Sequence, residues 1–264
     1  MAGGGILGVI VVIAALVAVK LLQGSPAPAK KGGVAAATVV QEATTVPAAT
    51  FNKVGFVAGV SAPETGSAFT HVPGTPVTAA GKPVVVYVGA EFCPFCAAER
   101  WGMVAAFSRF GTLHNLGETH SATADVYPNT PTFSFHGATY TSRYISLNTV
   151  EVATNQPQGS YYALLDKPNA LERRLSAKYD AAHIPFVYLG NYIITGPTYN
   201  PQVLSGLTMS QIATAMRDPS TNVSQAILGT ANNITAAICK LTNGQPTDVC
   251  SSSGVVAAAK HLPK

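Results

Sequence analysis

The sequence has few charged residues and no basic cluster. Charged side chains make up 11% of the 264 residues, and the 16 lysines and arginines exceed the 12 aspartates and glutamates by only four. A protein that binds nucleic acid through phosphate contacts needs a patch of lysine and arginine, often with aromatic residues among them. No stretch of this chain has such a patch, and the composition therefore argues against a nucleic-acid partner.

Histidine and cysteine are also scarce, with six and four residues. The histidines are scattered, and none stands near a cysteine at a spacing typical of a metal site. The four cysteines form two local pairs, Cys93 with Cys96 and Cys239 with Cys250. A zinc site made from both pairs is an alternative, but their unequal spacings and the context of the first pair favour a protein without a metal or another cofactor.

The longest hydrophobic run lies at the beginning of the sequence. Residues 6–22 are apolar except for Lys20, which is close to the minimum length for a transmembrane helix. We expect an uncleaved anchor here, with a signal peptide cleaved after Ala27-Pro28-Ala29 as the alternative. Lys30 and Lys31 follow the run, and by the positive-inside rule they favour a cytoplasmic location for the rest of the chain. Paired cysteines in a chain with an export signal favour an oxidising compartment, and we place the domain on the extracytoplasmic side.

The most informative stretch is residues 84–101, which contain the first cysteine pair. Residues 84–88 are β-branched or aromatic and stand between a Lys-Pro pair and Gly89, a pattern that predicts a buried strand. From residue 97 onward, apolar residues recur at the three- and four-residue spacing of a helix. The pair Cys93-Pro94-Phe95-Cys96 therefore stands at a turn between a strand and a helix.

A cysteine pair at such a turn has a chemical meaning. The unpaired amides of the first helical turn, together with the helix dipole, favour a negative charge there. Cys93 is therefore expected to lose its proton more readily than a free thiol, and the thiolate is the form that attacks disulfides. Cys96 lies one turn further along. The pattern predicts thiol–disulfide exchange, with Cys93 as the nucleophile and Cys96 as the resolving thiol.

Several polar residues are candidate modulators of the cysteine chemistry, either because they are near the pair in the sequence or because the fold is expected to bring them near it. Glu91 and Glu99 flank the cysteines and either accept protons or raise the thiol pKa by repulsion; we favour a solvated rim, and we expect Arg100 to be a surface residue as well. His183 either contacts the site or caps the end of the preceding helix. Trp101 is expected in the core.

Two β-hairpins are expected beyond the first helix. Residues 132–136 and 140–152 alternate as strands do, with a turn at residues 136–139. Residues 185–189 and 192–195 surround a Gly-Asn turn of the kind found in two-residue hairpins. Between the first helix and the first hairpin, the sequence predicts a polar loop.

Later helices are indicated by their caps. Asn169 with Glu172, and Thr208 with Gln211, have the spacing of a capping box, and residues 223–241 carry apolar side chains near helical spacing. Cys239 and Cys250 flank a short turn after this last helix. We predict that they form a structural disulfide, because neither stands at a helix start where a thiolate is favoured.

Two stretches resemble the thioredoxin superfamily. The residues from Val84 to Cys96 are similar to its active-site strand and turn, and His183-Ile184-Pro185-Phe186-Val187 is similar to its second signature, in which a cis-proline begins a strand and faces the cysteine pair. The resemblance implies that Pro185 lies beside Cys93 and that the backbone of Ile184 pairs with an extended substrate.

Thioredoxins often have an acidic residue on the strand before the cysteine pair. The matching positions here are Val85, Val86 and Tyr87, a departure that argues against efficient reductase activity. Longer phrases are similar to a membrane-anchored family catalogued as domain of unknown function 929. They lie at residues 89–101, 127–133, 144–146 and 236–239, and the similarity extends from about residue 51 to residue 250.

The resemblance and the patterns together imply an α/β protein with a thioredoxin-like fold. We expect a central mixed sheet flanked by helices, an added β-hairpin and a C-terminal helical extension, all preceded by one transmembrane helix. The expected parts are a transmembrane anchor at 1–23, a flexible linker at 24–50, a thioredoxin-like domain at 51–218 and the C-terminal extension with its disulfide at 219–264. Within the domain, residues 51–80 are expected to form a lead-in strand or hairpin.

The sequence is expected to encode a thiol–disulfide oxidoreductase that is anchored in the cell membrane, with its soluble domain on the extracytoplasmic side. Its partners would be cysteine-containing exported proteins and a redox partner that regenerates it; oxidation, reduction and isomerisation are all compatible with the pair. The alternative is a non-catalytic thioredoxin-like module that binds or stabilises a membrane complex, with a structural disulfide between Cys93 and Cys96. Copper delivery is a weaker alternative, because no histidine pairs with the cysteines.

Overall fold

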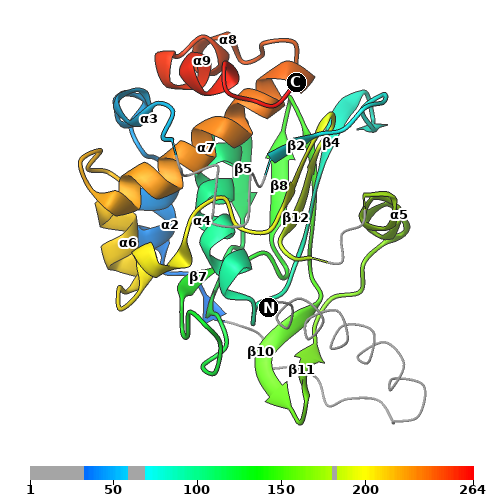
Figure 1. Ribbon diagram of the computed structural model, residues 1–264, viewed down its shortest axis with the longest axis vertical. Coiled ribbons are helices and arrows are strands. Elements are labelled where there is room, and N and C mark those ends of the chain that lie inside the picture. The colour runs from blue at the N-terminus through cyan, green and yellow to red at the C-terminus, as the bar shows by residue number, and fades with distance from the viewer. Residues whose placement is uncertain (1–32, 59–68, 180–182) are drawn as a thin grey trace, which may run out of the picture.

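The computed structural model describes residues 33–58, 69–179 and 183–264 (Figure 1). The expected transmembrane anchor at residues 1–23 lies outside these ranges. Within them, none of the helices combines the length and the apolar character that a membrane span requires. The described residues form a mixed α/β structure in which helices cover both faces of a central sheet.

The central sheet has six strands. They are β2 (Phe69–His71), β3 (Thr78–Ala79), β4 (Lys82–Gly89), β9 (Ser146–Glu151), β12 (Phe186–Leu189) and β13 (Tyr192–Thr195). Strand β4 is in the middle, parallel to β9 on one side and antiparallel to β12 on the other. Strand β13 pairs with β12 and β2 with β13, both antiparallel, while β3 pairs with the start of β4.

The predicted strand before the cysteines is present and has both faces buried. Val85 and Tyr87 belong to the larger hydrophobic core, whereas Val84, Val86 and Val88 belong to a smaller one that includes Leu175 of a later helix. Successive side chains of a strand point to opposite faces of the sheet. The continuous apolar run therefore serves two cores at once, as expected for a central strand that has a parallel neighbour.

The helices are grouped around this sheet. They are α2 (Ala37–Thr44), α3 (Ala48–Val54), α4 (Pro94–Phe107), α5 (Ala170–Lys178), the 3-10 helix η2 (Pro201–Leu204), α6 (Met209–Ala215), α7 (Asn222–Leu241), α8 (Thr247–Cys250) and α9 (Ser253–Ala259). Helices α4 and α7 lie on one side of the sheet and α5 on the other (Figure 1). Both predicted capping boxes are confirmed, at Asn169 and at Thr208.

The first predicted hairpin is wrong, and the second is confirmed. Strand β7 (Pro131–Ser134) pairs with β6 (Gly117–His120), and β8 (Thr139–Ser142) pairs with β5 (Gly111–His114). An alternating pattern shows that a strand is half-buried, but it does not name the strand's partner. Strand β6 also lies within the expected polar loop and pairs with β1 (Gly33–Val34). The confirmed hairpin joins β12 and β13 in register from Phe186↔Thr195 to Leu189↔Tyr192.

A further hairpin follows strand β9 and is bonded to the turn that carries the cysteine pair. Strands β10 (Ala153–Gln158) and β11 (Tyr161–Leu164) pair with each other in a sheet of their own. They project from the end of the molecule at which β9 finishes (Figure 1). The amide of Glu91 donates to the carbonyl of Ala153 at 2.9 Å, which connects this hairpin to the turn that follows β4.

The segment before residue 51 differs from the expected flexible linker over the part that the structure describes. Residues 37–44 form helix α2, in which Val39 and Ala43 are buried. They are four residues apart and so share one face of the helix, which packs against α4 and α6. Two short helices, α2 and α3, and two short strands, β2 and β3, stand where the sequence predicted a linker and a lead-in strand or hairpin.

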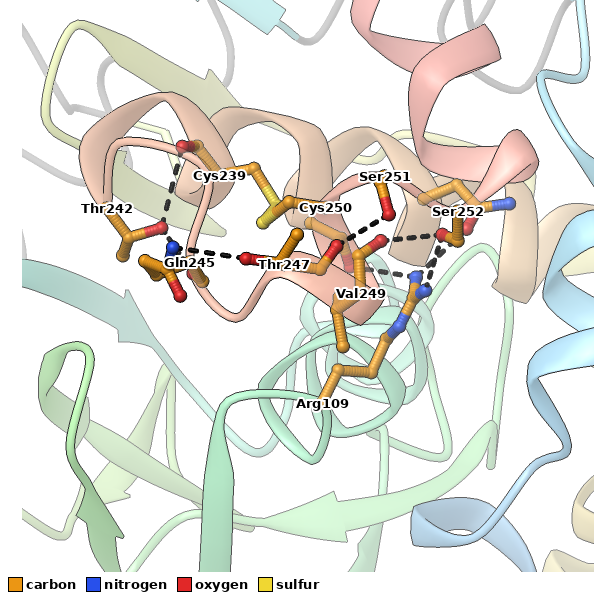
Figure 2. The surroundings of a disulfide bond; sticks show 11 residues. Arg109, Cys239, Thr242, Gln245, Thr247, Val249, Cys250, Ser251 and Ser252 are labelled. Atoms are coloured by element: carbon orange, nitrogen blue, oxygen red, sulfur yellow. Dashed lines mark hydrogen bonds between the residues drawn. A yellow bond between two sulfur atoms is a disulfide. The ribbon is translucent and has the colours of Figure 1, made fainter.

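The predicted disulfide between Cys239 and Cys250 is confirmed (Figure 2). It joins the end of α7 to α8 across 11 residues, a loop whose closure stabilises a fold by about 3 kcal/mol on the chain-entropy estimate. Two residues further on, the Ser252 hydroxyl accepts a hydrogen bond from Arg109, in the turn that follows α4, at 3.2 Å (Figure 2). The C-terminal segment is therefore attached both to α7 and to the turn after α4.

Candidate functional site at the start of helix α4

Cys93 is the N-cap residue of α4, and Pro94 is the first residue of the helix. The Cys93 Sγ accepts a hydrogen bond from the amide of Cys96 at 3.3 Å, as the side chain of an N-cap residue does. Both sulfur atoms are free thiols, and they share one strand-to-helix junction. The local arrangement that the spacing predicted is therefore present.

The segment before β12 lies against Cys93. The Ile184–Pro185 peptide bond is cis, and the carbonyl oxygen of Ile184 is 3.7 Å from the Cys93 Sγ. Because β12 pairs with β4, the start of one strand faces the end of the other. The side chain of His183 is exposed. The structure thus brings Cys93, Cys96, Ile184 and Pro185 together.

The two cysteines differ in their access to solvent. Cys93 is 4% exposed and Cys96 is 0% exposed. Two aromatic residues of the stretch around the cysteines make ring contacts with later parts of the chain: Phe92 stacks on Tyr162 at 4.3 Å, and Phe95 meets Tyr127 edge-on at 5.9 Å between ring centroids. Any sulfur that reacts with this pair must therefore reach Cys93 first.

The two thiols also differ in acidity. Burial raises the pKa of Cys93. Hydrogen bonds from the side chain and amide of Cys96 and the positive charge of Arg100 lower it by more, so the pKa falls below its usual value. For Cys96, burial, the hydrogen bond to Cys93 and the charge of Cys93 all raise the pKa well above its usual value. Cys93 is thus the thiol that ionises first.

Arg100 is fully buried, and the expectation of a surface residue is wrong. Its Nη1 donates to both carboxylate oxygens of Glu151 at 2.9 Å and to the hydroxyl of Tyr87 at 3.0 Å, and its Nε donates to Thr132 at 3.4 Å. A buried charge requires such pairing because it loses its hydration. Glu151 is the last residue of β9, the strand parallel to β4.

The expected rim formed by Glu91 and Glu99 is also wrong, because both side chains are buried. Glu91 accepts from the Ser134 hydroxyl at 2.6 Å. The Oε2 of Glu99 accepts from the Thr198 amide at 3.1 Å and hydroxyl at 2.7 Å, and its Oε1 has no hydrogen-bond partner within the described part of the chain. Burial raises the pKa of Glu99 to about 7.

Tyr87 and Glu151 were not among the predicted site residues. Tyr87 extends along its strand over Gly89, where a Cβ atom would lie 2.0 Å from the tyrosine hydroxyl. A glycine is required there so that the hydroxyl can reach Arg100. The presence of a tyrosine within a run of valines, two residues before a glycine, was the available signal for Tyr87. Nothing in the sequence near Glu151 indicated its partner.

The described residues contain no group of three or more histidine, cysteine, aspartate or glutamate side chains that could hold a metal ion. The zinc alternative that used all four cysteines is contradicted by the disulfide, because Cys239 and Cys250 are bonded to each other. Trp101 is buried in the core as predicted, and its indole donates to the carbonyl of Pro131 at 2.9 Å.

These features define a mixed α/β protein with two free cysteines at a strand-to-helix junction. The cysteines are separated by two residues and lie next to a segment with a cis-proline. The chain belongs to the family described as Domain of unknown function (DUF929), whose model matches residues 68–160 and 160–240. The match confirms the expected similarity to this family. No curated protein and no solved structure is significantly similar to the chain.

Proposed function

We propose that this protein is a thiol–disulfide oxidoreductase that acts on cysteine-containing polypeptides. The observation that carries the proposal is the asymmetry of the cysteine pair. Cys93 stands at the start of α4, its sulfur accepts a hydrogen bond from an amide, and the residue is 4% exposed, whereas Cys96 is fully enclosed. A nucleophile that ionises readily and a second thiol held in reserve are the parts that this exchange requires.

The arrangement of the sheet supports a thioredoxin-like fold for the domain. The order β9-β4-β12-β13 has one parallel and two antiparallel pairings, and the cysteine pair follows the central strand β4. The cis-proline segment precedes β12 and meets Cys93. On this view, the β10–β11 hairpin and the helices after residue 219 are additions to the central unit.

The exchange proceeds in two steps on a substrate disulfide. The Cys93 thiolate attacks one substrate sulfur, so that a mixed disulfide forms, the substrate's S–S bond breaks and its other sulfur leaves as a thiolate that takes up a proton. Cys96 then loses its proton and attacks the Cys93 sulfur. The second substrate thiol is released, and the pair has given two electrons to the substrate. The reverse sequence oxidises a substrate dithiol.

The substrates we propose are exported proteins, and the location is the extracytoplasmic side of the cell membrane, with the N-terminal hydrophobic run as the anchor. The disulfide between Cys239 and Cys250 supports an oxidising compartment, because such bonds persist there. A second redox protein is needed to return Cys93 and Cys96 to their starting state after each cycle.

The burial of Cys93 is the observation that favours the alternative, a binding module whose first cysteine pair is structural. A cysteine residue that is 4% exposed admits a partner sulfur only if the partner fits closely against the residues that cover it. The reduction potential separates the two views. A value below about −300 mV is typical of structural bridges and would favour the module.

Single cysteine variants test the proposal directly. Cys96→Ser, incubated with two peptides joined by one disulfide, is expected to retain one peptide as a mixed disulfide on Cys93 and to release the other as a thiol, because no resolving thiol is left. Cys93→Ser is expected to retain none. Mass spectrometry of the intact protein reads both results. Equal trapping by the two variants, or trapping by neither, would contradict the proposed roles.

A further inference from the structure

Arg100 is the charged residue that connects the elements beneath the cysteine pair. It lies four residues after Cys96 on α4, its side chain is 0% exposed, and its guanidinium contacts residues of β4, β7 and β9. Its partner Glu151 is equally enclosed. The ion pair and the two thiols therefore share one environment from which water is excluded, where a charge acts more strongly on its neighbours than it does in water.

A single carbonyl links the guanidinium to the turn that carries the nucleophile. The oxygen of Ala90 accepts from the amide of Cys93 at 3.3 Å and from Nη1 of Arg100 at 3.4 Å. The Nη2 of Arg100 is buried and has no hydrogen-bond partner within the described residues. Buried donors are rarely left unpaired without a reason. This donor therefore leaves part of the positive charge of Arg100 uncompensated in the buried region beneath the cysteine pair.

We propose that Arg100 is a positioning residue that stabilises the thiolates of the cysteine pair, and that Glu151 opposes this effect by partly neutralising Arg100. The inference deepens the proposed thiol–disulfide exchange and rests on it for its biological meaning. The ionisable groups that interact with Arg100 are Glu151 on β9, Tyr87 on β4, Glu91 in the turn, and the two thiols, Cys93 and Cys96, at the start of its own helix. Arg100 is the cation of this group.

The charges act on the sulfurs with opposite signs. Arg100 lowers the pKa of both thiols, whereas Glu151 raises the pKa of Cys96. Removing either partner breaks the same buried ion pair and disturbs the fold in a similar way. A purely structural role therefore predicts similar changes in thiol acidity for the two variants, and an electrostatic role predicts opposite changes.

The test is a pH titration of the two thiols in Arg100→Gln and Glu151→Gln, followed by thiolate absorbance at 240 nm and by the rate of alkylation with iodoacetamide. Because the thiols interact, two macroscopic pKa values are measured. Arg100→Gln is expected to raise both by about one unit or more, which lowers the alkylation rate at a pH below both values by about tenfold. Glu151→Gln is expected to lower the second value.

Two control variants make the result decisive. Arg109→Gln removes another arginine, which stands in the turn after α4 and donates to Asn232 and Ser252, and is expected to leave both thiol pKa values unchanged. Arg100→Lys keeps the charge and is expected to restore part of the acidity. If Arg100→Gln does not fold, the shifts in Arg100→Lys and Glu151→Gln decide the question.

A folded Arg100→Gln variant with unchanged thiol pKa values would overturn the inference, as would a Glu151→Gln variant whose second pKa rises. The titration needs no substrate. A wild-type protein that exchanges no disulfide, but whose variants show the expected shifts, would therefore contradict the proposed function and leave the role of Arg100 intact.

Discussion

Glu99 and Arg100 are neighbours on α4, yet their buried side chains meet different partners. Arg100 pairs with Glu151 beneath the cysteines, while Glu99 contacts Thr198, which follows β13. Thr198 in turn shares a hydrogen bond with Thr230 of α7 at 2.6 Å. Consecutive helical residues point about 100° apart, and a helix enclosed on several sides buries them both.

The carboxyl group of Glu99 makes the stability of the protein depend on pH. Its pKa is about 7 in the folded protein, compared with 4.5 for a free glutamate side chain, the value taken for the unfolded chain. Between these values the folded state binds more protons than the unfolded state, so the free energy of unfolding falls as the pH rises. We expect Glu99 to contribute a loss of about 3 kcal/mol between pH 4.5 and pH 8.

The measurement is urea unfolding at several pH values for wild type and Glu99→Gln. The amide keeps the shape of the carboxyl group and its oxygen still accepts from Thr198, but it does not ionise. Its stability is therefore expected to fall less steeply over the same range. Identical slopes for the two proteins would show that Glu99 does not ionise at a raised pKa.

At the scale of elements, α4 and α7 pack closely enough to require a glycine. A Cβ atom on Gly102 would lie 2.5 Å from the Cγ2 of Thr230 and 3.1 Å from its Cβ. Thr230 is not free to turn away without losing its hydrogen bond to Thr198. The contact between the two helices therefore depends on small side chains, as close helix packing does in general.

Gly102→Ala is expected to destabilise the protein by about 1 to 2 kcal/mol. Crowding of a packed interior costs about 1 to 3 kcal/mol, and the better helix propensity of alanine offsets up to about 1 kcal/mol of this. In a Thr230→Ser background the clashing methyl group is absent, so the same substitution should cost less. Equal losses in both backgrounds, measured by thermal unfolding, would rule out this contact as the cause.

At the scale of the whole molecule, helices α2 and α3, within residues 33–58, belong to the same folded structure as the later helices. Arg217 donates to the carbonyls of Glu42 and Thr45 at 3.2 and 3.0 Å. Asn232 of α7 donates to the carbonyls of Phe51 and Gly55, both at 2.9 Å. Helices α2 and α3 are thus held by residues that lie more than 150 positions later in the sequence.

Val39→Ala is expected to lower the free energy of unfolding by about 2 kcal/mol, because Val39 is buried and two carbon atoms lose their contacts. Val34→Ala is the matched control: Val34 is 84% exposed and its replacement should have no measurable effect. Chemical unfolding of the two variants gives the comparison. Equal stabilities would mean that α2 does not contribute to the core.

Local spacing was sufficient for the elements that depend on near neighbours. The apolar run of β4, the capping boxes of α5 and α6, the β12–β13 hairpin and the disulfide of the C-terminal loop all involve residues within about a dozen positions of each other. Their patterns have direct steric or hydrogen-bonding causes. The same is true of Cys93 at the start of α4, whose position relative to the helix follows from the order of residues alone.

The surroundings of the cysteine pair were decided by tertiary structure. Arg100 is 51 residues from Glu151, and Glu99 is 99 residues from Thr198. A charged side chain is buried only where a partner offsets its lost hydration, and the sequence around it does not show whether such a partner will arrive. The sequence by itself therefore determined where the sulfur atoms stand on the chain, and the folded structure determined the charges that act on them.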